Sequence, residues 1–389
     1  MALAMQQLLL SWILIGILEL PATQVGLIQA LIGFPGIFVL LMGGAVADRA
    51  DPRNLLIGVY IIAPVFPVFL IAMDFGGWFA VWSVIVWGFG MGLVQSYSMP
   101  AQQAILNRVS GDHVQKSVTA ATAAGFVVQV IGLGLAGQID RLGISPVLFV
   151  QGLVIALAAW AMTRVSKVTN ESPRLRESTL RGIADGLRAT YRNRVIFNVL
   201  AINFASSIFN AGAMMTVLPF IVKRVYQGDA LTLSALMAVF FGGAALSNAI
   251  LLRFMPLLRP GRLFLVMQLS RVVVLYVVYL RPDWWLLVLA VFFWGLNMGV
   301  TSNLPRTIVQ ESAEPAFRGR ILSVFSVSMV GSAPIGAVVL GWLIENVGTL
   351  NALWPAMLLS VLLFAYGTLF TGVWRYQSQP SVSATGSAP

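Results

Sequence analysis

The 389-residue chain contains no cysteine and a single histidine, His113. Without thiols it can form no disulfide, no thiolate metal site and no cysteine nucleophile. One imidazole is too few for the usual zinc or haem ligand sets. No cluster of acids or metal ligands can be assembled from the remaining residues, so we expect no metal, no cofactor and no enzyme activity.

Charged residues are also scarce, at 10% of the chain, whereas an average soluble domain has about 25%. Hydrophobic residues make up 58%, which excludes an ordinary soluble globular protein. Long charge-free runs, each near the roughly 20 residues that a bilayer-spanning helix needs, predict an all-α polytopic membrane protein. The first run could instead be a signal peptide, but it lacks a basic start. We place twelve transmembrane helices near residues 2–18, 24–47, 54–73, 78–98, 117–138, 146–163, 196–222, 231–252, 263–280, 284–304, 321–343 and 351–374.

The net charge of +10 comes from basic residues that are unevenly distributed between the predicted loops. If the N-terminus is cytoplasmic, the cytoplasmic loops hold nineteen Lys and Arg residues and the outer loops hold four. This bias follows the positive-inside rule and predicts a protein integral to the cell membrane, bacterial inner or plasma, with both termini in the cytoplasm. It also explains the basic balance without a nucleic-acid partner.

The only long polar segment is residues 164–195. It is predicted to be a cytoplasmic linker between an N-terminal six-helix half, residues 1–163, and a C-terminal six-helix half, residues 196–376. Residues 377–389 are rich in Ser, Ala and Pro and are predicted to be a disordered tail. Within the linker, apolar residues at helical spacing predict an amphipathic helix that lies against membrane lipids; they are Leu180, Ile183, Leu187 and Tyr191.

The two predicted halves repeat a local pattern. Trp87-Gly-Phe-Gly-Met-Gly92 matches Trp294-Gly-Leu-Asn-Met-Gly299, and a proline follows each, Pro100 and Pro305. The copies lie about 207 residues apart, in the fourth span of each half. Because each half has an even number of spans, the halves are expected to face the same way, related by an axis along the membrane normal.

The loop after the second predicted span contains Gly44, Asp48, Arg49 and Arg53. Their spacing resembles the G-x-x-x-D-R-x-G-R-R loop of the major facilitator superfamily, although Asp51 and Pro52 replace its usual Gly and Arg. Two further segments resemble the enterobactin-exporter-like and macrolide-efflux-like branch; they are Pro100 to Leu106 and Gly319 to Ser323.

The resemblance implies two six-helix halves around a central cavity, a monomer that works by alternating access, and export driven by a proton gradient. Three departures from the exporters stand out. The fifth span lacks their proline between Gly132 and Gly137, the fourth span has no arginine, and the first span is short. Relatives usually have a longer lead, so an extension upstream of Met1 stays open.

The first loop is expected to act as a gate. Asp48 would face the positive N-terminal end of the eleventh span. Arg49 and Arg53 would clamp carboxylates or lipid phosphates nearby. The alternative is that these residues are ordinary charges of a cytoplasmic loop.

Polar residues inside the spans suggest a substrate site. Asn203, Ser206, Ser207 and Asn210 lie on one helical face. In this superfamily the first, fourth, seventh and tenth spans line the cavity, so the resemblance turns this face inward. The alternative is that these polar groups join helices by hydrogen bonds. The same two interpretations apply to Gln95, Trp294, Asn297 and Thr301.

Two ionisable residues are singled out by position. Arg271 lies mid-span, where a charge is costly and is a functional candidate by default, although a structural partner or snorkelling would also explain it. Glu19 ends the first span and is the candidate proton carrier, with an ordinary interfacial carboxylate as the alternative.

The sequence therefore predicts a secondary active transporter that exports drug-like or siderophore-like amphipathic small molecules. An uptake carrier or lipid transporter of the same fold remains an alternative, and so does a membrane scaffold or sensor that transports nothing.

Overall fold

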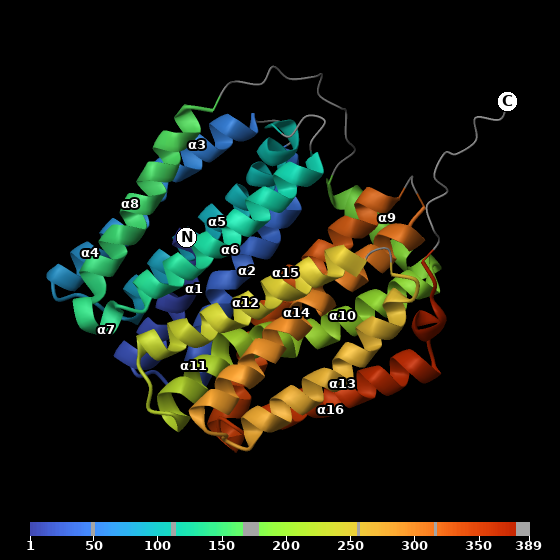
Figure 1. Cartoon of the computed structure of the whole chain (residues 1–389). Coiled ribbons are helices and arrows are strands. Elements are labelled where there is room, and N and C mark those ends of the chain that lie inside the picture. Colours follow the sequence, from blue (N-terminus) through green and yellow to red (C-terminus); the bar gives the residue numbers. More distant parts are fainter. Residues whose placement is uncertain (48–50, 110–113, 166–178, 255–256, 315–316, 379–389) are drawn as a thin grey trace.

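The computed structural model describes residues 1–47, 51–109, 114–165, 179–254, 257–314 and 317–378 (Figure 1). All regular elements in these ranges are helices. Seven helical segments of the described residues are long and apolar enough to cross a bilayer, and three shorter helices are apolar as well. The chain is thus an all-helical membrane protein, as its composition predicts.

The N-terminal part, residues 1–165, begins with α1 (Ala2–Trp12) and the π-helix η1 (Ile13–Ile17). Pro64 separates α3 from α4, so the predicted span 54–73 is two helices in succession. Asp51 starts α3, because its side chain accepts a hydrogen bond from the backbone N–H of Arg53 while Pro52 takes the first helical position. The remaining helices are α2 (Ala22–Ala47), α3 (Pro52–Ile62), α4 (Val65–Phe75), α5 (Val81–Val109), α6 (Val114–Ala136), α7 (Ile139–Leu142) and α8 (Ile144–Thr163).

Helix α9 (Thr179–Arg192) precedes the C-terminal part, residues 194–378. Asn193 starts α10, since its side chain accepts from the backbone N–H groups of Val195 and Ile196. The elements are α10 (Arg194–Gly212), the π-helices η3 (Ala213–Val217) and η4 (Ile221–Val225) around α11 (Leu218–Phe220), α12 (Ala230–Phe254), α13 (Pro260–Tyr279), α14 (Trp284–Ser312), α15 (Arg318–Val347), α16 (Leu353–Leu369) and the 3₁₀ turn η5 (Val373–Arg375).

Helices α5 and α14 extend beyond the ranges 78–98 and 284–304 that apolar composition predicts. Each has 29 residues and continues past an internal proline, Pro100 or Pro305, into a polar end. Hydropathy marks only the part of a helix that lipid surrounds, so it misses such polar extensions.

Two helix pairs make the most extensive contacts between the N-terminal and C-terminal parts, α2 with α15 and α6 with α12. Figure 1 shows α1 to α8 grouped on one side and α10 to α16 on the other, with these pairs between them. Glycine permits the close approach of α2 and α15. A Cβ on Gly26 would clash with the carbonyl oxygen of Ala337, and one on Gly341 would meet the carbonyl oxygen of Ala22.

Backbone features recur between the two parts. The π-helices η1 and η4 occupy corresponding places. The described residues with positive φ also pair off, each pair about 204 to 208 residues apart; the pairs are Glu19 with Gln227, Gly77 with Arg281, and Gly143 with Gly348. Recurrence of such rare conformations indicates one helical plan used twice.

Candidate functional site

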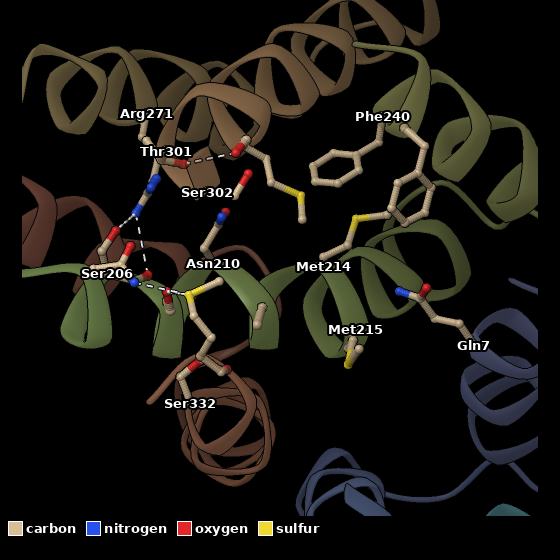
Figure 2. A pocket seen from close by; sticks show the side chains of 16 residues that line it. Gln7, Ser206, Asn210, Met214, Met215, Phe240, Arg271, Thr301, Ser302 and Ser332 are labelled. Atoms are coloured by element: carbon tan, nitrogen blue, oxygen red, sulfur yellow. Dashed lines mark hydrogen bonds between the residues drawn. The ribbon is translucent and has the colours of Figure 1, made fainter. Parts of the chain in front are cut away.

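A cavity of about 130 Å³ lies among the middle turns of the C-terminal helices (Figure 2). Its wall comes from α10, η3, α12, α13, α14 and α15, and Gln7 of α1 is the one described lining residue from the N-terminal part. The lining combines polar side chains with methionines and phenylalanines. A cavity of this kind, with few polar groups in an apolar wall, has the usual character of a small-molecule site.

The polar face predicted on α10 lines this cavity with all four residues, Asn203, Ser206, Ser207 and Asn210. Asn203 Nδ2 lies 3.1 Å and Ser207 Oγ 3.5 Å from the sulfur of Met329. A thioether is a weak acceptor. These donors therefore have poor partners in the protein and remain suited to a better acceptor.

The predicted residues of α14 have two different roles, cavity lining and hydrogen bonding between helices. Thr301 lines the cavity. Trp294 and Asn297 do not; their side chains tie α14 to neighbouring helices. Trp294 Nε1 donates to Asn210 Oδ1 at 2.9 Å, and Asn297 Nδ2 donates to the carbonyl of Met267 at 2.6 Å.

Gln95 of α5 lies apart from the cavity lining. It is exposed, and its amide contacts the sulfur of Met99 on the next helical turn.

Arg271 of α13 also lines the cavity. Only 3% of the residue is exposed. Its Nη1 donates to Ser206 Oγ at 2.5 Å and approaches the Ser206 carbonyl at 3.5 Å. The partner of this mid-span cation is thus a neutral hydroxyl on the facing helix.

Two carboxylates join the N-terminal and C-terminal parts at one end of the molecule, here called the latch end. Asp140 Oδ2 accepts from the backbone N–H of Ala230, the first residue of α12, at 2.8 Å. Glu345 Oε2 accepts from the N–H of Ala22, the first residue of α2, at 2.9 Å. Each carboxylate therefore caps a helix of the opposite part, where the helix dipole favours negative charge.

The N-terminus of α12 carries a second carboxylate, Asp229. Hydrogen bonds from the side chain and backbone of Thr232 hold the pKa of the Asp229 carboxyl below its usual value. This cap stays within the C-terminal part, unlike that of Asp140.

A polar network separates the cavity from the latch end. Ser11 Oγ and Gln29 Nε2 both donate to the carbonyl of Met215, each at 3.1 Å. Thr216 Oγ1 donates to Gln29 Oε1 at 2.7 Å. Further contacts between the two parts lie nearer the latch end, where Lys223 Nζ donates to the carbonyl of Gly16 at 3.4 Å.

Glu19 lies at the latch end and does not line the central cavity. Its carboxylate is 3.9 Å from Lys223 Nζ, and 73% of its side chain is exposed. Both residues border a second hollow, together with Arg224. The structure thus shows Glu19 as a partner of Lys223 at the surface, and proton carriage stays a prediction.

The predicted gating residues are only partly described. Gly44 lies on α2, and Asp48 and Arg49 fall outside the described residues. Arg53 donates from Nη2 to the carbonyl of Thr163 at 2.7 Å and from Nε to that of Val165 at 2.5 Å. It therefore caps the C-terminal end of α8, where free carbonyls attract a cation.

No group of three or more His, Asp or Glu side chains that could hold a metal ion occurs in the part of the chain that the structure describes. The arrangement instead offers a mixed polar and apolar chamber that is closed toward the latch end.

Comparison with known proteins gives a family and a fold. Residues 1–381 match the model of a family described as transmembrane secretion effector, a branch of the major facilitator superfamily. No curated protein matches the chain.

Two solved transporters share the fold. The structure of the nucleoside transporter NupG has a TM-score of 0.73 at 12% identity, covering 96% of this chain and 98% of that one. A bacterial homologue of the human lysosomal transporter Spinster, in an inward-facing and unoccupied conformation, has a TM-score of 0.68 at 13% identity, covering 96% of this chain and 95% of that one.

Proposed function

The chain belongs to the transmembrane secretion effector family of the major facilitator superfamily, and we propose on that basis that it is a secondary transporter that exports amphipathic small molecules. It is an integral membrane protein with the fold of this superfamily. The observation that carries the proposal is the central cavity, because a chamber lined by both polar and apolar groups among membrane helices suits an amphipathic cargo.

The proposed architecture is twelve transmembrane helices in two six-helix halves around this cavity, residues 1–163 and 196–376. The paired π-helices and the paired positive-φ residues support it, since both recur at the same interval as the Trp-Gly motifs. The linker 164–195 contains α9, which packs against the start of α15 through Arg320 and Asp185, 3.4 Å apart.

The proposed orientation places the latch end outside the cell and α9 in the cytoplasm, with both termini. The positive-inside bias supports this orientation. The closed network of Ser11, Gln29 and Met215 then lies on the outer side of the cavity, so the described conformation would admit cargo from the cytoplasm. Opening the latch end and closing the α9 end would complete alternating access.

Coupling and assembly are proposed from the family. A proton gradient would drive export by a monomer in the cell membrane, without a cofactor and without enzyme activity. Glu19 remains the candidate proton carrier, because it moves with α1 at the entrance that protons would use.

Transport by the purified chain in proteoliposomes tests the proposal. With an imposed pH gradient, a panel of fluorescent amphipathic dyes should move toward the side that the latch end faces. Arg188→Cys and Gln227→Cys in this cysteine-free chain, labelled with an impermeant thiol reagent, assign the two faces.

Asn203→Ala should change which dyes move more than it changes the amount of folded protein, because its amide has only a thioether partner. Movement in the opposite direction would identify an uptake carrier. A folded protein that moves no dye would contradict the transport proposal.

A further inference from the structure

The central cavity contains one isolated positive charge. Arg271 is the only charged side chain among its described lining residues. In the described part of the chain no acid forms an ion pair with it, and its Nη1 donates to the hydroxyl and carbonyl of Ser206. A cation this deeply buried is costly unless a negative charge compensates it.

Hydrogen-bond donors without acceptors surround the same charge. Among the described residues, neither Arg271 Nε nor the Nε2 of the fully buried Gln268 has a hydrogen-bond partner. Ser206, which accepts from Arg271, donates in turn to Gln268 Oε1 at 3.1 Å. What this corner of the protein lacks is an acceptor, and an anion would supply one with the matching charge.

Methionine and phenylalanine side chains form much of the cavity wall away from Arg271. Figure 2 shows Arg271 and Ser206 at one end, and Met214 and Phe240 at the other. Methionine and phenylalanine offer adaptable, polarisable surface for an aliphatic or aromatic body. The cavity therefore has a cationic end and an apolar end.

We infer that the cavity binds an amphipathic organic anion, with its acidic head on Arg271 and Ser206 and its apolar body against Met214 and Phe240. A guanidinium presents several donors in a fixed fork, which fits a carboxylate or similar planar head. This inference rests on the proposed function, since it names the substrate class for the same cavity.

Binding of three matched probes to the full chain in detergent tests the inference. Naphthylacetate carries the anionic head, and naphthylethanol and naphthylethylamine keep the ring with a neutral or a cationic head. The unaltered protein should bind the carboxylate at least about tenfold more tightly than the alcohol, as measured by calorimetry. The carboxylate should also raise the midpoint of thermal unfolding.

Arg271→Gln should abolish the preference, so that the carboxylate and the alcohol bind within about twofold of each other. Arg271→Lys should keep part of it, because the charge remains and the fork is lost. Arg259→Gln is the matched control, since it removes an exposed cation at the start of the same helix and should leave the preference unchanged. If Arg271→Gln does not fold, Ser206→Ala should weaken carboxylate binding severalfold and spare the alcohol.

Several outcomes would overturn the anion site. They are a tighter fit of the alcohol or amine, no carboxylate binding at millimolar concentration, or an unchanged preference in Arg271→Gln. The binding assay needs no transport, so the two proposals can fail separately. Anion preference without dye movement in proteoliposomes would reject the transporter proposal and support the anion site. Dye movement without anion preference would support the transporter proposal and reject the anion site.

Discussion

The N-terminal and C-terminal parts of the molecule share a backbone plan and differ in what their interiors contain. Helices α5 and α14 have the same length, an internal proline and the same Trp-Gly motif. Yet Trp294 donates to Asn210, whereas the buried indole N–H of Trp87 has no acceptor in the part of the chain that the structure describes. At the offset set by η1 and η4, the position that corresponds to Asn210 is Ala2.

The two parts therefore share their backbone arrangement, while the side chains of the candidate binding site come mainly from the C-terminal part. Nearly all described lining residues of the cavity come from the C-terminal part. Features that hold the two parts together, in contrast, are reciprocal: Asp140 caps α12, and Glu345 caps α2. The described contacts are therefore symmetric where the two parts meet at the latch end and asymmetric around the cavity.

The largest effect is expected from a glycine of the repeated motif. A Cβ on Gly295 would clash with the backbone carbonyl of Phe240, so Gly295→Ala must separate α14 from α12. We expect a loss of roughly 3 kcal/mol in stability. The corresponding Gly88 faces the flexible end of Ile32, so Gly88→Ala should change stability by less than about 1 kcal/mol. Thermal unfolding in detergent measures both, and equal losses would show that the two motifs pack alike.

The two reciprocal helix caps at the latch end, Asp140 on α12 and Glu345 on α2, should have the next largest effect. Asp140→Asn or Glu345→Gln alone should each shift the closed population about twofold to fivefold toward an open latch end, and the double variant should multiply the shifts. Spin labels at Trp78→Cys and Trp285→Cys, exposed residues at corresponding places, measure the separation. Asp229→Asn, which caps α12 from within its own part, is the control. If only one of the two variants changed the separation, the two caps would not be equivalent.

The smallest effect concerns the two tryptophans. Trp294→Phe should cost about 1–2 kcal/mol, because it leaves the partly buried oxygen of Asn210 without its donor and removes part of a buried ring. Trp87→Phe removes an N–H that has no acceptor among the described residues, so we expect it to cost only the packing of the larger ring and less than Trp294→Phe. Thermal unfolding of both variants provides the measurement. A greater loss in Trp87→Phe would indicate a partner for its indole that the structure does not show.

Local periodicity predicts the parts of the site that depend on one helix alone. The spacing of Asn203, Ser206, Ser207 and Asn210 places them on one face, and that face lines the cavity. The apolar runs likewise locate the helices, with errors where Pro64 interrupts a run and where polar ends continue α5 and α14.

Contacts between distant segments could not be predicted from the sequence. Asp140 and Glu345 look like ordinary acids at helix ends, and only the fold brings them to α12 and α2, 90 and 323 residues away. Arg271 meets Ser206 across 65 residues, so its place on the cavity depends on how α13 packs against α10. Helical spacing also cannot say which neighbour a face meets, so the sequence left both the cavity and the interhelical interpretation open for Trp294 and Asn297.

If Arg271 binds an anionic cargo, its isolated charge would make the transport cycle move net charge across the membrane. A carrier that holds a monoanion on this residue would reorient as a neutral unit, and the empty carrier would return with one positive charge. In a cell with a negative interior, the voltage favours that return by about 2.3 kcal/mol for each 100 mV, if the charge crosses the whole field. The membrane potential alone could then drive net export of an anion, which matters for a cavity whose described lining contains no carboxylate to carry a proton.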